Sequence, residues 1–262
     1  MPRNCAPKYR LRKGSIPQTD VHMPDAPRPC NTHLDLVGFK YPLRNLTQSL
    51  KRQRKTRIVA IGSSSTAGER SPTGEIKIVP FPPRLELALR LWSFGRMIDV
   101  LNRGVRGQEA TDEMSRFEPD VIAEAPALVI WQVGTNAVFR EGVYSFDEVA
   151  ASIEAGIDWL AALSIDVVLM DLQYTTALVK PETKLESARK MVSLISTAAE
   201  KKGVNLFRRF ALMERWFLQD GILLEELVDP DDNDHLHMSD WATNCVTKAL
   251  FEAITKAPPA AV

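Results

Sequence analysis

From residue 57 onward, short apolar runs alternate with segments whose apolar residues recur at helical spacing. Five runs have the length and composition of strands: 57–62, 97–104, 127–134, 166–174 and 204–209. The runs at 57–62 and 127–134 contain few polar residues, as expected for strands covered on both faces. Strands that alternate with helices predict a parallel sheet with helices on both faces, because right-handed crossovers place them there.

The segments between these runs predict helices. Helical patterns cover 82–92, 107–125 with an interruption at Pro119, 145–163, 183–202, 210–219 and 239–257. In a capping box, two side chains three residues apart each satisfy the other residue's free backbone N–H. Two pairs have this spacing, Ser145 with Glu148 and Thr183 with Glu186. They predict the starts of the helices that follow them.

Residues 1–56 differ from this body in composition. They contain seven prolines and few periodic apolar positions, which predicts an irregular arm. Residues 1–57 hold 13 Lys and Arg against three Asp, a net charge of +10, whereas the whole chain of 262 residues is neutral. We therefore expect a basic arm (1–56) before a mildly acidic globular domain (57–262). The basic run at 51–57 is compatible with nucleic-acid binding, but a solvated lead-in to the first strand is favoured.

The cysteines and the absence of long apolar runs bear on the cellular compartment. Cys5, Cys30 and Cys245 are scattered and lack the spacing of a metal site. We expect free thiols in a reducing compartment, with a Cys5–Cys30 bridge as the alternative. No run approaches the roughly 20 apolar residues of a membrane helix, and the N-terminus lacks the apolar stretch of a secretory signal. The sequence thus predicts a cytoplasmic protein, and it leaves open signal-independent export, a trimmed start and the oligomeric state.

Several predicted strands end in loops of small or polar residues, and ligands bind at that edge of a parallel sheet. The first such loop, GSSSTAG, offers Gly62 for a sharp turn and then Ser64. A phosphate-binding loop is excluded because Glu69 stands where that motif needs Lys. The next two loops contain Gly107, which a ligand can approach closely, and Asn136, which carries an amide donor.

The fourth loop, DPDDNDHLHMSDW, precedes the last predicted helix. Asp234 and His237 are three residues apart, so the carboxylate can orient the imidazole, and Asp232 with His235 has the same spacing. We favour His237 because Ser239 can cap the helix behind it. A serine nucleophile needs such a base, and the base needs such a partner. The acidic run lacks the glycine and the glutamate that an EF-hand requires at its sixth and twelfth positions, so a calcium site is not expected.

These four loops together resemble the SGNH (GDSL-like) hydrolase family. Its blocks are a Ser in a G-D-S-x-T-x-G-like stretch, a Gly, an Asn in G-x-N, and D-x-x-H near the C-terminus. Here they read GSSSTAG, Gly107, GTN and DHLH, within roughly residues 57–257. The resemblance implies a three-layer α/β/α, flavodoxin-like fold with a five-stranded parallel sheet. Two positions depart from it, since Ser63 and Ala137 stand where the family or many of its members have Asp.

The resemblance also implies a mechanism. Ser64 would be the nucleophile of a serine esterase, His237 its general base and Asp234 the residue that orients His237. The oxyanion hole would consist of the backbone N–H groups of Ser64 and Gly107 and the side-chain amide of Asn136. No metal or organic cofactor is implied.

The substrate is less strongly indicated, because the family includes lipases, thioesterases, lysophospholipases and carbohydrate O-acetyl esterases. No long glycine-hinged apolar insertion follows any of the blocks, which favours short acyl groups, with acetyl on a carbohydrate as the first expectation. Phe81, Phe139 and Tyr174 lie near strand or loop ends, where they can stack on a sugar or, more commonly, pack in the core. The alternatives are a lysophospholipase or thioesterase, and a weakly active relative that binds a partner through its basic arm. Neither a membrane nor a nucleic acid is expected as the partner.

Overall fold

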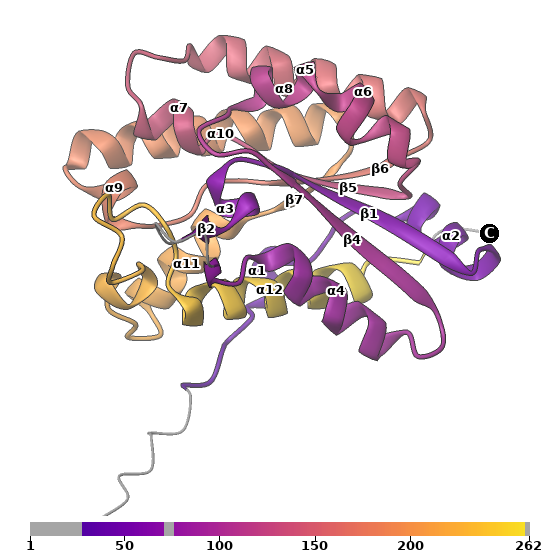
Figure 1. Ribbon diagram of the computed structural model, residues 1–262. Helices are drawn as coiled ribbons and strands as arrows, with labels where there is room; N and C mark the ends of the chain where they lie inside the picture. The colour runs from indigo at the N-terminus through magenta and orange to yellow at the C-terminus, as the bar shows by residue number, and fades with distance from the viewer. Residues whose placement is uncertain (1–27, 71–75, 260–262) are drawn as a thin grey trace, which may run out of the picture.

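A parallel sheet of five strands runs through the middle of the protein (Figure 1). The computed structural model describes residues 28–70 and 76–259. The sheet has the order β4-β1-β5-β6-β7, and all neighbouring strands are parallel. Its strands are β1 (Lys55–Gly62), β4 (Met97–Gly104), β5 (Leu128–Gln132), β6 (Asp166–Met170) and β7 (Asn205–Phe207). The predicted α/β fold is confirmed, and the strand order is that of a flavodoxin-like sheet.

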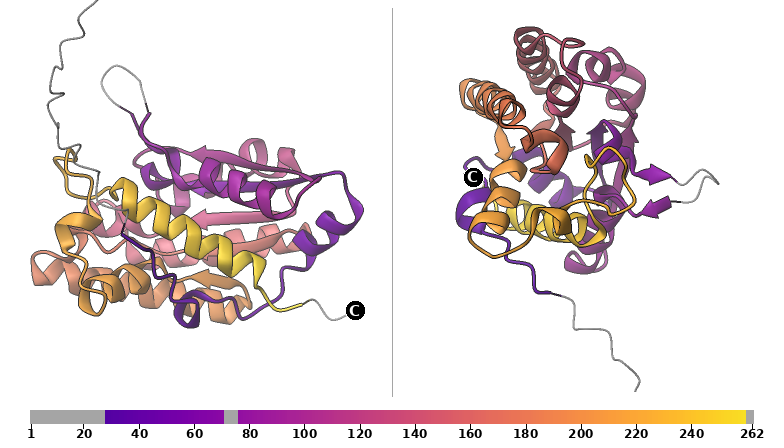
Figure 2. Two further views of the ribbon diagram at one scale, coloured as in Figure 1. Left: turned by 90° about the horizontal axis from the view of Figure 1, so that it is seen from below. Right: turned by 90° about the vertical axis from the view of Figure 1, so that its left-hand side faces the viewer.

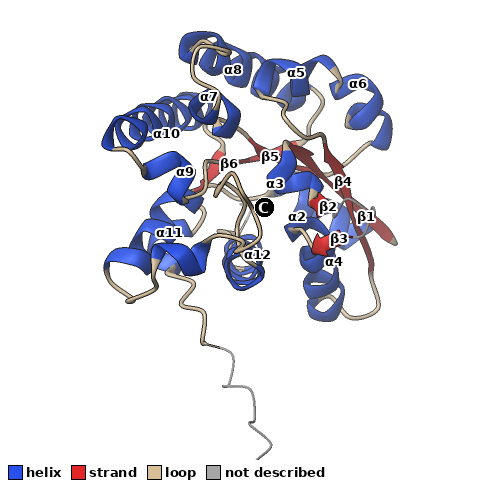
Figure 3. Ribbon diagram, turned by 60° about the vertical axis from the view of Figure 1, so that its left-hand side comes forward, coloured by secondary structure: helices blue, strands red, loops and turns tan. Residues whose placement is uncertain are grey.

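Helices cover both faces of the sheet, which makes three layers (Figures 1, 2 and 3). On one face lie α5 (Ala110–Ser115), α6 (Phe117–Asp120), α7 (Thr135–Phe139), α8 (Phe146–Ala162) and α10 (Glu182–Lys202). On the other face lie α1 (Leu34–Val37), α4 (Phe81–Trp92), α11 (Arg209–Leu218) and α12 (Asp240–Thr255). Other short elements are α3 (Ser64–Ala67), α9 (Thr176–Val179), the 3-10 turns Ile122–Glu124 and Leu224–Leu227, and the hairpin of β2 (Glu69–Arg70) and β3 (Ile76–Ile78).

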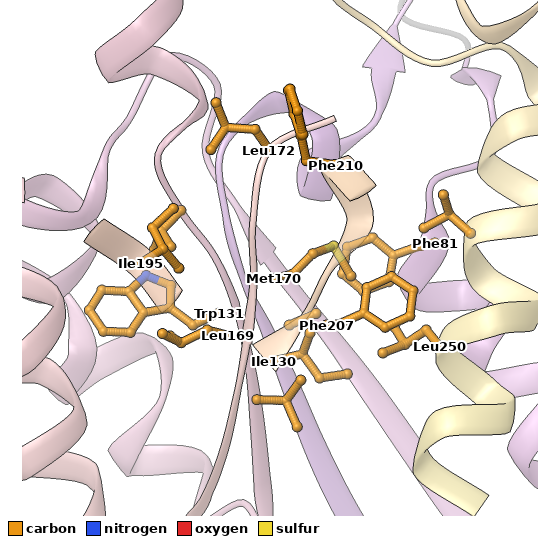
Figure 4. Close-up of a cluster of buried hydrophobic side chains, with 14 of the residues drawn as sticks. Phe81, Ile130, Trp131, Leu169, Met170, Leu172, Ile195, Phe207, Phe210 and Leu250 are labelled. Carbon is orange, nitrogen blue, oxygen red and sulfur yellow. The ribbon is translucent and has the colours of Figure 1, made fainter. Parts of the chain in front are cut away.

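The core fills the space between the sheet and both helical layers. Successive side chains of a strand point to opposite faces, so β5 sends Trp131 towards Ile195 of α10 and Ile130 towards the layer that contains Leu250 of α12 (Figure 4). All four side chains are fully buried. Burial on both faces explains why the central strands are almost continuously apolar in sequence.

The register of the sheet brings three strand ends together. β1 pairs with β4 up to Gly62 opposite Gly104, and with β5 up to Ile61 opposite Trp131. The loops that follow these three strands therefore emerge side by side at the carboxyl edge of the sheet. The strand order reverses between β1 and β5. In open α/β sheets, ligands bind at the carboxyl ends of the strands beside such a point.

The helix starts are only partly as predicted. Ser145 Oγ accepts a hydrogen bond from the backbone N–H of Glu148 at the start of α8, which is one half of the expected capping box. The second predicted box is wrong, because α10 begins at Glu182 after Pro181, and no side chain caps it. Thr183 and Glu186 thus lie inside the first turns of the helix rather than at its boundary.

The segment from residue 28 to the first strand packs on the domain, which corrects the prediction of an irregular arm up to residue 56. It contains α1 and α2 (Arg44–Arg52), and Val37, Leu43 and Leu46 are buried in the main core. The exposed side of α2 is strongly basic, and its few apolar residues stand among Arg, Lys and Gln. The helical spacing of the apolar residues was therefore not recognised in the sequence. Residues 1–27, which carry the rest of the predicted arm, lie outside the described residues.

A disulfide joins this N-terminal segment to the last helix. Cys30 and Cys245 are 215 residues apart in the chain, and their Cα atoms are 5.4 Å apart. The prediction of free thiols is therefore wrong for these two residues, and Cys30 is not free to pair with Cys5, which lies outside the described residues. Disulfides persist mainly in oxidising compartments, so this bond does not fit the cytoplasmic location that the sequence predicts.

Of the helices in residues 28–70 and 76–259, none has both the length and the apolar character needed to cross a membrane.

Candidate functional site

The turn after β1 presents Ser64 at the start of α3. Gly62 is required at this turn because a Cβ there would lie 2.5 Å from Thr66 Oγ1. The side chain of Ser64 is nearly buried, and its Oγ lies 2.9 Å from Nε2 of His237, which is 173 residues later in the chain. The fold thus brings together the hydroxyl and the imidazole that the sequence singled out.

The loop before α12 supplies His237 and the carboxylate that holds it. His237 Nδ1 lies 3.0 Å from Asp232 Oδ2, and the same oxygen accepts hydrogen bonds from the backbone N–H groups of His237, at 2.7 Å, and Leu236, at 2.8 Å. One carboxylate therefore fixes both the ring and the backbone that carries it. Ser239, two residues after His237, caps α12 as predicted, because its Oγ accepts a hydrogen bond from the backbone N–H of Ala242. This cap joins the loop to the start of the helix.

Asp232 is ionised at neutral pH. Partial burial acts to raise the pKa of its carboxyl, but the backbone N–H of His237, the nearby imidazole and two further N–H donors outweigh burial, so the pKa lies below its ordinary value. An ionised carboxylate beside Nδ1 favours the tautomer with the proton on Nδ1. Nε2 is then the acceptor that faces the Ser64 hydroxyl.

The structure corrects the expected partner of His237. Asp234 is exposed, and its backbone N–H donates to Asp232 Oδ1 at 3.2 Å. The chain reverses at His235, which has a φ of 51°, and its N–H donates to the carbonyl of Asp232. This turn brings His237 back to the residue five positions earlier, so the three-residue spacing was misleading. The alternative pairing of Asp232 with His235 had the right carboxylate but the wrong imidazole, because His235 is exposed.

The three expected oxyanion donors lie on adjoining loops. The amide Nδ2 of the buried Asn136 donates to the carbonyl of Gln108 at 2.8 Å, next to Gly107. The loop after β4 is also attached to the turn after β1, because the N–H of Val105 donates to the carbonyl of Gly62 at 2.9 Å. Asn136 carries a second amide hydrogen beyond the one that Gln108 accepts, so it retains a donor for a ligand.

Gly107 adopts a conformation that other residues rarely take. Its φ is 78°, and a Cβ there would lie 2.8 Å from Nη2 of Arg140. The hydroxyl of Tyr144 lies 3.1 Å from the carbonyl oxygen of Gly107 and 3.0 Å from Asp112 Oδ2, both of which are acceptors. The contact with Tyr144 holds the peptide group that follows Gly107.

A buried carboxylate that sequence reasoning missed supports the loop of Asn136. Glu109 accepts hydrogen bonds from the backbone N–H groups of Gly134, at 2.6 Å, Ala137, at 2.9 Å, and Ala110, at 3.0 Å. Burial raises the pKa of Glu109, although these N–H donors oppose the rise. The sequence shows only a glutamate at a helix start, and it gives no sign that this side chain spans to the next loop.

A small pocket adjoins the Ser64 hydroxyl. It is lined by Ser64, Ser65, Gly68, Ile78, Pro80, His237, Met238 and Thr243, and it encloses about 30 Å³. None of the three aromatic residues singled out by the sequence is in this lining. Phe81 is fully buried and Tyr174 packs edge-on against Phe210, which agrees with the favoured expectation of core packing. Phe139 is half-buried against the core. Within the described ranges, no three His, Cys, Asp or Glu side chains gather where they could hold a metal ion.

The fold has known relatives among solved structures. An acetylxylan esterase from Geobacillus stearothermophilus, Axe2, superposes with a TM-score of 0.64 at 19% sequence identity, over 76% of this chain and 94% of that one. LAE5, an alpha/beta hydrolase from the metagenome of Lake Arreo in Spain, does so with a TM-score of 0.64 at 17% identity, over 78% and 97% of the two chains. No curated protein matches the sequence. These likenesses confirm the expected three-layer α/β/α fold.

The family itself is shown by a match over most of the chain. Residues 29–258 fit the model of the Non-GDSL lipase-like family, so the match begins well before the predicted domain boundary at residue 57. The family description agrees with the departure at Ser63, where the aspartate of the GDS block is missing. The chain therefore belongs to the Non-GDSL lipase-like family.

Proposed function

We propose that this protein is a serine esterase that hydrolyses carboxylic esters of short acyl groups, with acetyl groups on a carbohydrate as the first candidate substrate. The observation that carries the proposal is the hydrogen-bonded series from Ser64 Oγ through the His237 ring to Asp232 Oδ2, with distances of 2.9 and 3.0 Å. This order of hydroxyl, imidazole and carboxylate is what a serine nucleophile needs for activation.

In the first half-reaction, Ser64 Oγ attacks the ester carbonyl while its proton moves to Nε2 of His237. The new C–O bond forms as the carbonyl electron pair moves onto oxygen, and Asp232 stabilises the imidazolium that results. Collapse of the tetrahedral intermediate breaks the bond to the alcohol oxygen, which takes the proton from Nε2. The products of this step are the free alcohol and an acyl group on Ser64.

The negative charge on the tetrahedral intermediate requires donors on the other side of Ser64. The N–H groups of Ser64 and Gly107 and the amide of Asn136 serve this role in the proposed mechanism, as the family resemblance implied. Two observations support this assignment. Asn136 is hydrogen-bonded to the loop that contains Gly107, and hydrogen bonds from Tyr144 and to Glu109 hold the two loops in place. A fixed donor in a water-poor site stabilises such a charge far better than a mobile one.

In the second half-reaction, a water molecule takes the place of the alcohol. His237 Nε2 removes its proton as the oxygen attacks the acyl carbonyl, and the proton returns to Ser64 Oγ when the acyl bond breaks. The carboxylic acid leaves and the resting enzyme is restored. The same imidazole serves as base and acid in both halves, so the step needs only the groups at this site.

The size of the pocket supports a short acyl group. A single water requires about 10–15 Å³ of such space, and the pocket beside Ser64 offers about 30 Å³. This room suits the methyl group of an acetyl ester. Ile78, Pro80 and Met238 contribute apolar walls. The substrates in the names of the structural relatives, acetylxylan and acetyl-xylooligosaccharide, point in the same direction.

The test is hydrolysis of p-nitrophenyl esters by the wild type and by Ser64→Ala. Release of p-nitrophenol from the acetate should fall by at least about 10³-fold in the variant. Along a series from acetate to octanoate, kcat/KM should decrease, and acetate should be released from acetylated xylooligosaccharides. Equal rates for wild type and variant would reject the esterase. A preference for octanoate would instead favour a lipase or lysophospholipase.

A further inference from the structure

Beneath the Ser64 turn lies the buried side chain of Gln132, at the end of β5. Its Oε1 lies within hydrogen-bond distance of three donors, the backbone N–H of Ser63 at 3.1 Å, the hydroxyl of Ser63 at 3.1 Å and the hydroxyl of Thr66 at 3.3 Å. Ser63 and Thr66 flank the nucleophile on either side. One amide oxygen thus holds together the turn that presents Ser64.

The amide nitrogen of Gln132 continues the connection towards the other loops. Gln132 Nε2 donates to Thr135 Oγ1 at 3.2 Å, and the Thr135 hydroxyl donates to Gln173 Oε1 at 3.1 Å. Gln173 Nε2 then donates to the carbonyl of Leu236 at 3.1 Å. Thr135 precedes Asn136 and Leu236 precedes His237, so the series passes one residue away from both.

A buried arginine fixes the direction of every bond in this series. Arg209 can only donate, and its Nη2 donates to Gln173 Oε1 at 2.8 Å. Gln173 therefore turns its oxygen towards Arg209 and Thr135 and its nitrogen towards Leu236. Because the Thr135 hydroxyl donates to that oxygen, it accepts from Gln132, which in turn leaves Gln132 Oε1 as the acceptor for the Ser64 turn.

The series is shielded from water over its whole length. Ser63, Thr66, Gln132, Thr135, Gln173 and Arg209 are each at most 2% exposed. Hydrogen bonds in such surroundings are stronger than in water, and a member left without its partner is costly. The arrangement is therefore stiff, and it links elements that are far apart in sequence.

We propose that Gln132, Thr135 and Gln173 are positioning residues, which set the spacing between the loops that carry Ser64, Asn136 and His237. This inference rests on the proposed function, because that spacing matters to an esterase. None of the three side chains is placed to touch the ester. They act through the backbone and hydroxyl groups of the residues beside the nucleophile, the amide donor and the base.

The series also gives a physical account of the departure at Ser63. The hydroxyl at that position donates to Gln132 Oε1. An aspartate there would place an ionised oxygen against the amide oxygen of Gln132, and two acceptors would face each other. The serine at position 63 and the glutamine at position 132 are in this sense complementary.

The most direct variant is Thr135→Val, which keeps the shape of the side chain and removes the hydroxyl in the middle of the series. Thr135→Ser keeps the hydroxyl and is the conservative partner. Asn205→Leu is the matched control, because Asn205 is also buried and its amide makes three hydrogen bonds, to Lys40 and Tyr41, away from the site. Each variant is assayed for kcat and KM on p-nitrophenyl acetate and for thermal unfolding.

A misplacement of about 1 Å can cost about 10²-fold in rate. We expect Thr135→Val to lower kcat about 10- to 100-fold with KM within threefold, and Thr135→Ser to stay within threefold of the wild type. Asn205→Leu should lower the melting temperature but leave kcat of the folded protein unchanged. A Thr135→Val variant that melts earlier yet keeps wild-type kcat would overturn the proposal, since the series would then contribute stability alone.

A readout that is independent of activity keeps the two proposals separate. In protein labelled with ¹⁵N-histidine, the Nδ1–H resonance of His237 is identified by its loss in His237→Ala. Thr135→Val should broaden or shift it, and Thr135→Ser and Asn205→Leu should not. If hydrolysis proves independent of Ser64, the esterase proposal fails while this resonance still decides the positioning proposal. An unchanged resonance in Thr135→Val would reject it.

Discussion

His237 Nδ1 lies 3.0 Å from Oδ2 of Asp232, five residues earlier in the chain, and not against Asp234, which is three residues earlier and exposed. The difference changes which carboxylate stabilises the imidazolium. Asp232 is held in place by N–H groups of Asp234, Leu236 and His237. It therefore combines the two properties that the role requires, a fixed direction and a pKa below its ordinary value.

Replacement of this carboxylate is the first prediction. Asp232→Asn should lower kcat on p-nitrophenyl acetate by about 10³- to 10⁴-fold, because an amide at this position favours the wrong imidazole tautomer. Asp234→Asn is the matched control, with the same chemical change two residues away, and should stay within about threefold of the wild type. The opposite ranking in steady-state kinetics would return the role to Asp234. By the same geometry, His237→Ala should impair the enzyme far more than His235→Ala.

The second prediction concerns the oxyanion donors. Asn136→Ala should lower kcat by about 10²- to 10³-fold, the usual effect of removing one such donor, with a small change in KM. The expected mechanism is loss of stabilisation in the transition state rather than weaker substrate binding. A variant that raises KM and leaves kcat unchanged would place the Asn136 side chain in ground-state binding instead.

The third prediction follows from the disulfide. The sequence contains three cysteines, and Cys30 with Cys245 are bonded, so the denatured, unreduced chain should titrate one thiol and the reduced chain three. Loss of a bond that closes so long a loop should lower the free energy of unfolding by about 2–5 kcal/mol. Dithiothreitol should accordingly lower the melting temperature of the wild type but not that of Cys245→Ala.

The matched control for the disulfide is Cys5→Ala, which leaves the Cys30–Cys245 bond intact. It should melt at the wild-type temperature and remain sensitive to dithiothreitol. Three reactive thiols in the unreduced chain, or a Cys5→Ala variant that loses its response to the reductant, would contradict the observed pairing.

The fourth prediction concerns the pH dependence of stability. Burial raises the pKa of Asp171 to about 7, against the opposing influence of the Phe210 N–H and the Arg209 guanidinium. Between the unfolded pKa of about 3.9 and about 7, the folded protein therefore holds a proton that the unfolded chain releases. Stability from this group is complete below the unfolded pKa and falls as pH rises through the window, by up to about 1.4 kcal/mol per pH unit.

The Asp171→Asn variant tests this sign. The amide keeps an oxygen for the N–H of Phe210, which donates to Asp171 Oδ1 at 2.9 Å, and it cannot ionise. The melting temperature of the variant relative to the wild type should therefore rise between pH 5 and pH 8. Burial also raises the pKa values of Glu109 and Glu113. The stability of the variant should therefore still fall as the pH rises, but less steeply than that of the wild type. A difference between variant and wild type that does not change with pH would contradict the prediction.

Most of the sheet could be predicted from the sequence, because strands buried on both faces leave long apolar runs. The five predicted strands overlap those observed, and β5 is buried at all five of its positions. The helices of the N-terminal segment could not be predicted in the same way. There, the buried Leu46 and the half-buried Leu50 of α2 are separated by polar residues and flanked by basic ones, and the prolines and charges of residues 1–57 dominate the composition.

At the site too, some residues could be predicted from their spacing in the sequence, and others become evident only in the folded structure. Ser64, Gly107 and Asn136 follow strands, and the parallel topology brings such positions to one edge. The choice of Asp232 depends on a turn at His235 with a positive φ, which spacing alone does not specify. Gln132 is the last residue of a strand that is otherwise apolar, so its hydrogen bonds to the Ser64 turn were not predictable.

The central claim is that Ser64 is a nucleophile activated by His237, and covalent labelling tests it most directly. The wild type is treated with a phosphonate or fluorophosphate that reacts with activated serines, and the product is examined by intact-protein and peptide mass spectrometry. We predict one added group, on Ser64, none on Ser64→Ala and strongly slowed addition on His237→Ala. Absence of labelling in the folded wild type, or a label on another residue that persists in Ser64→Ala, would contradict the claim.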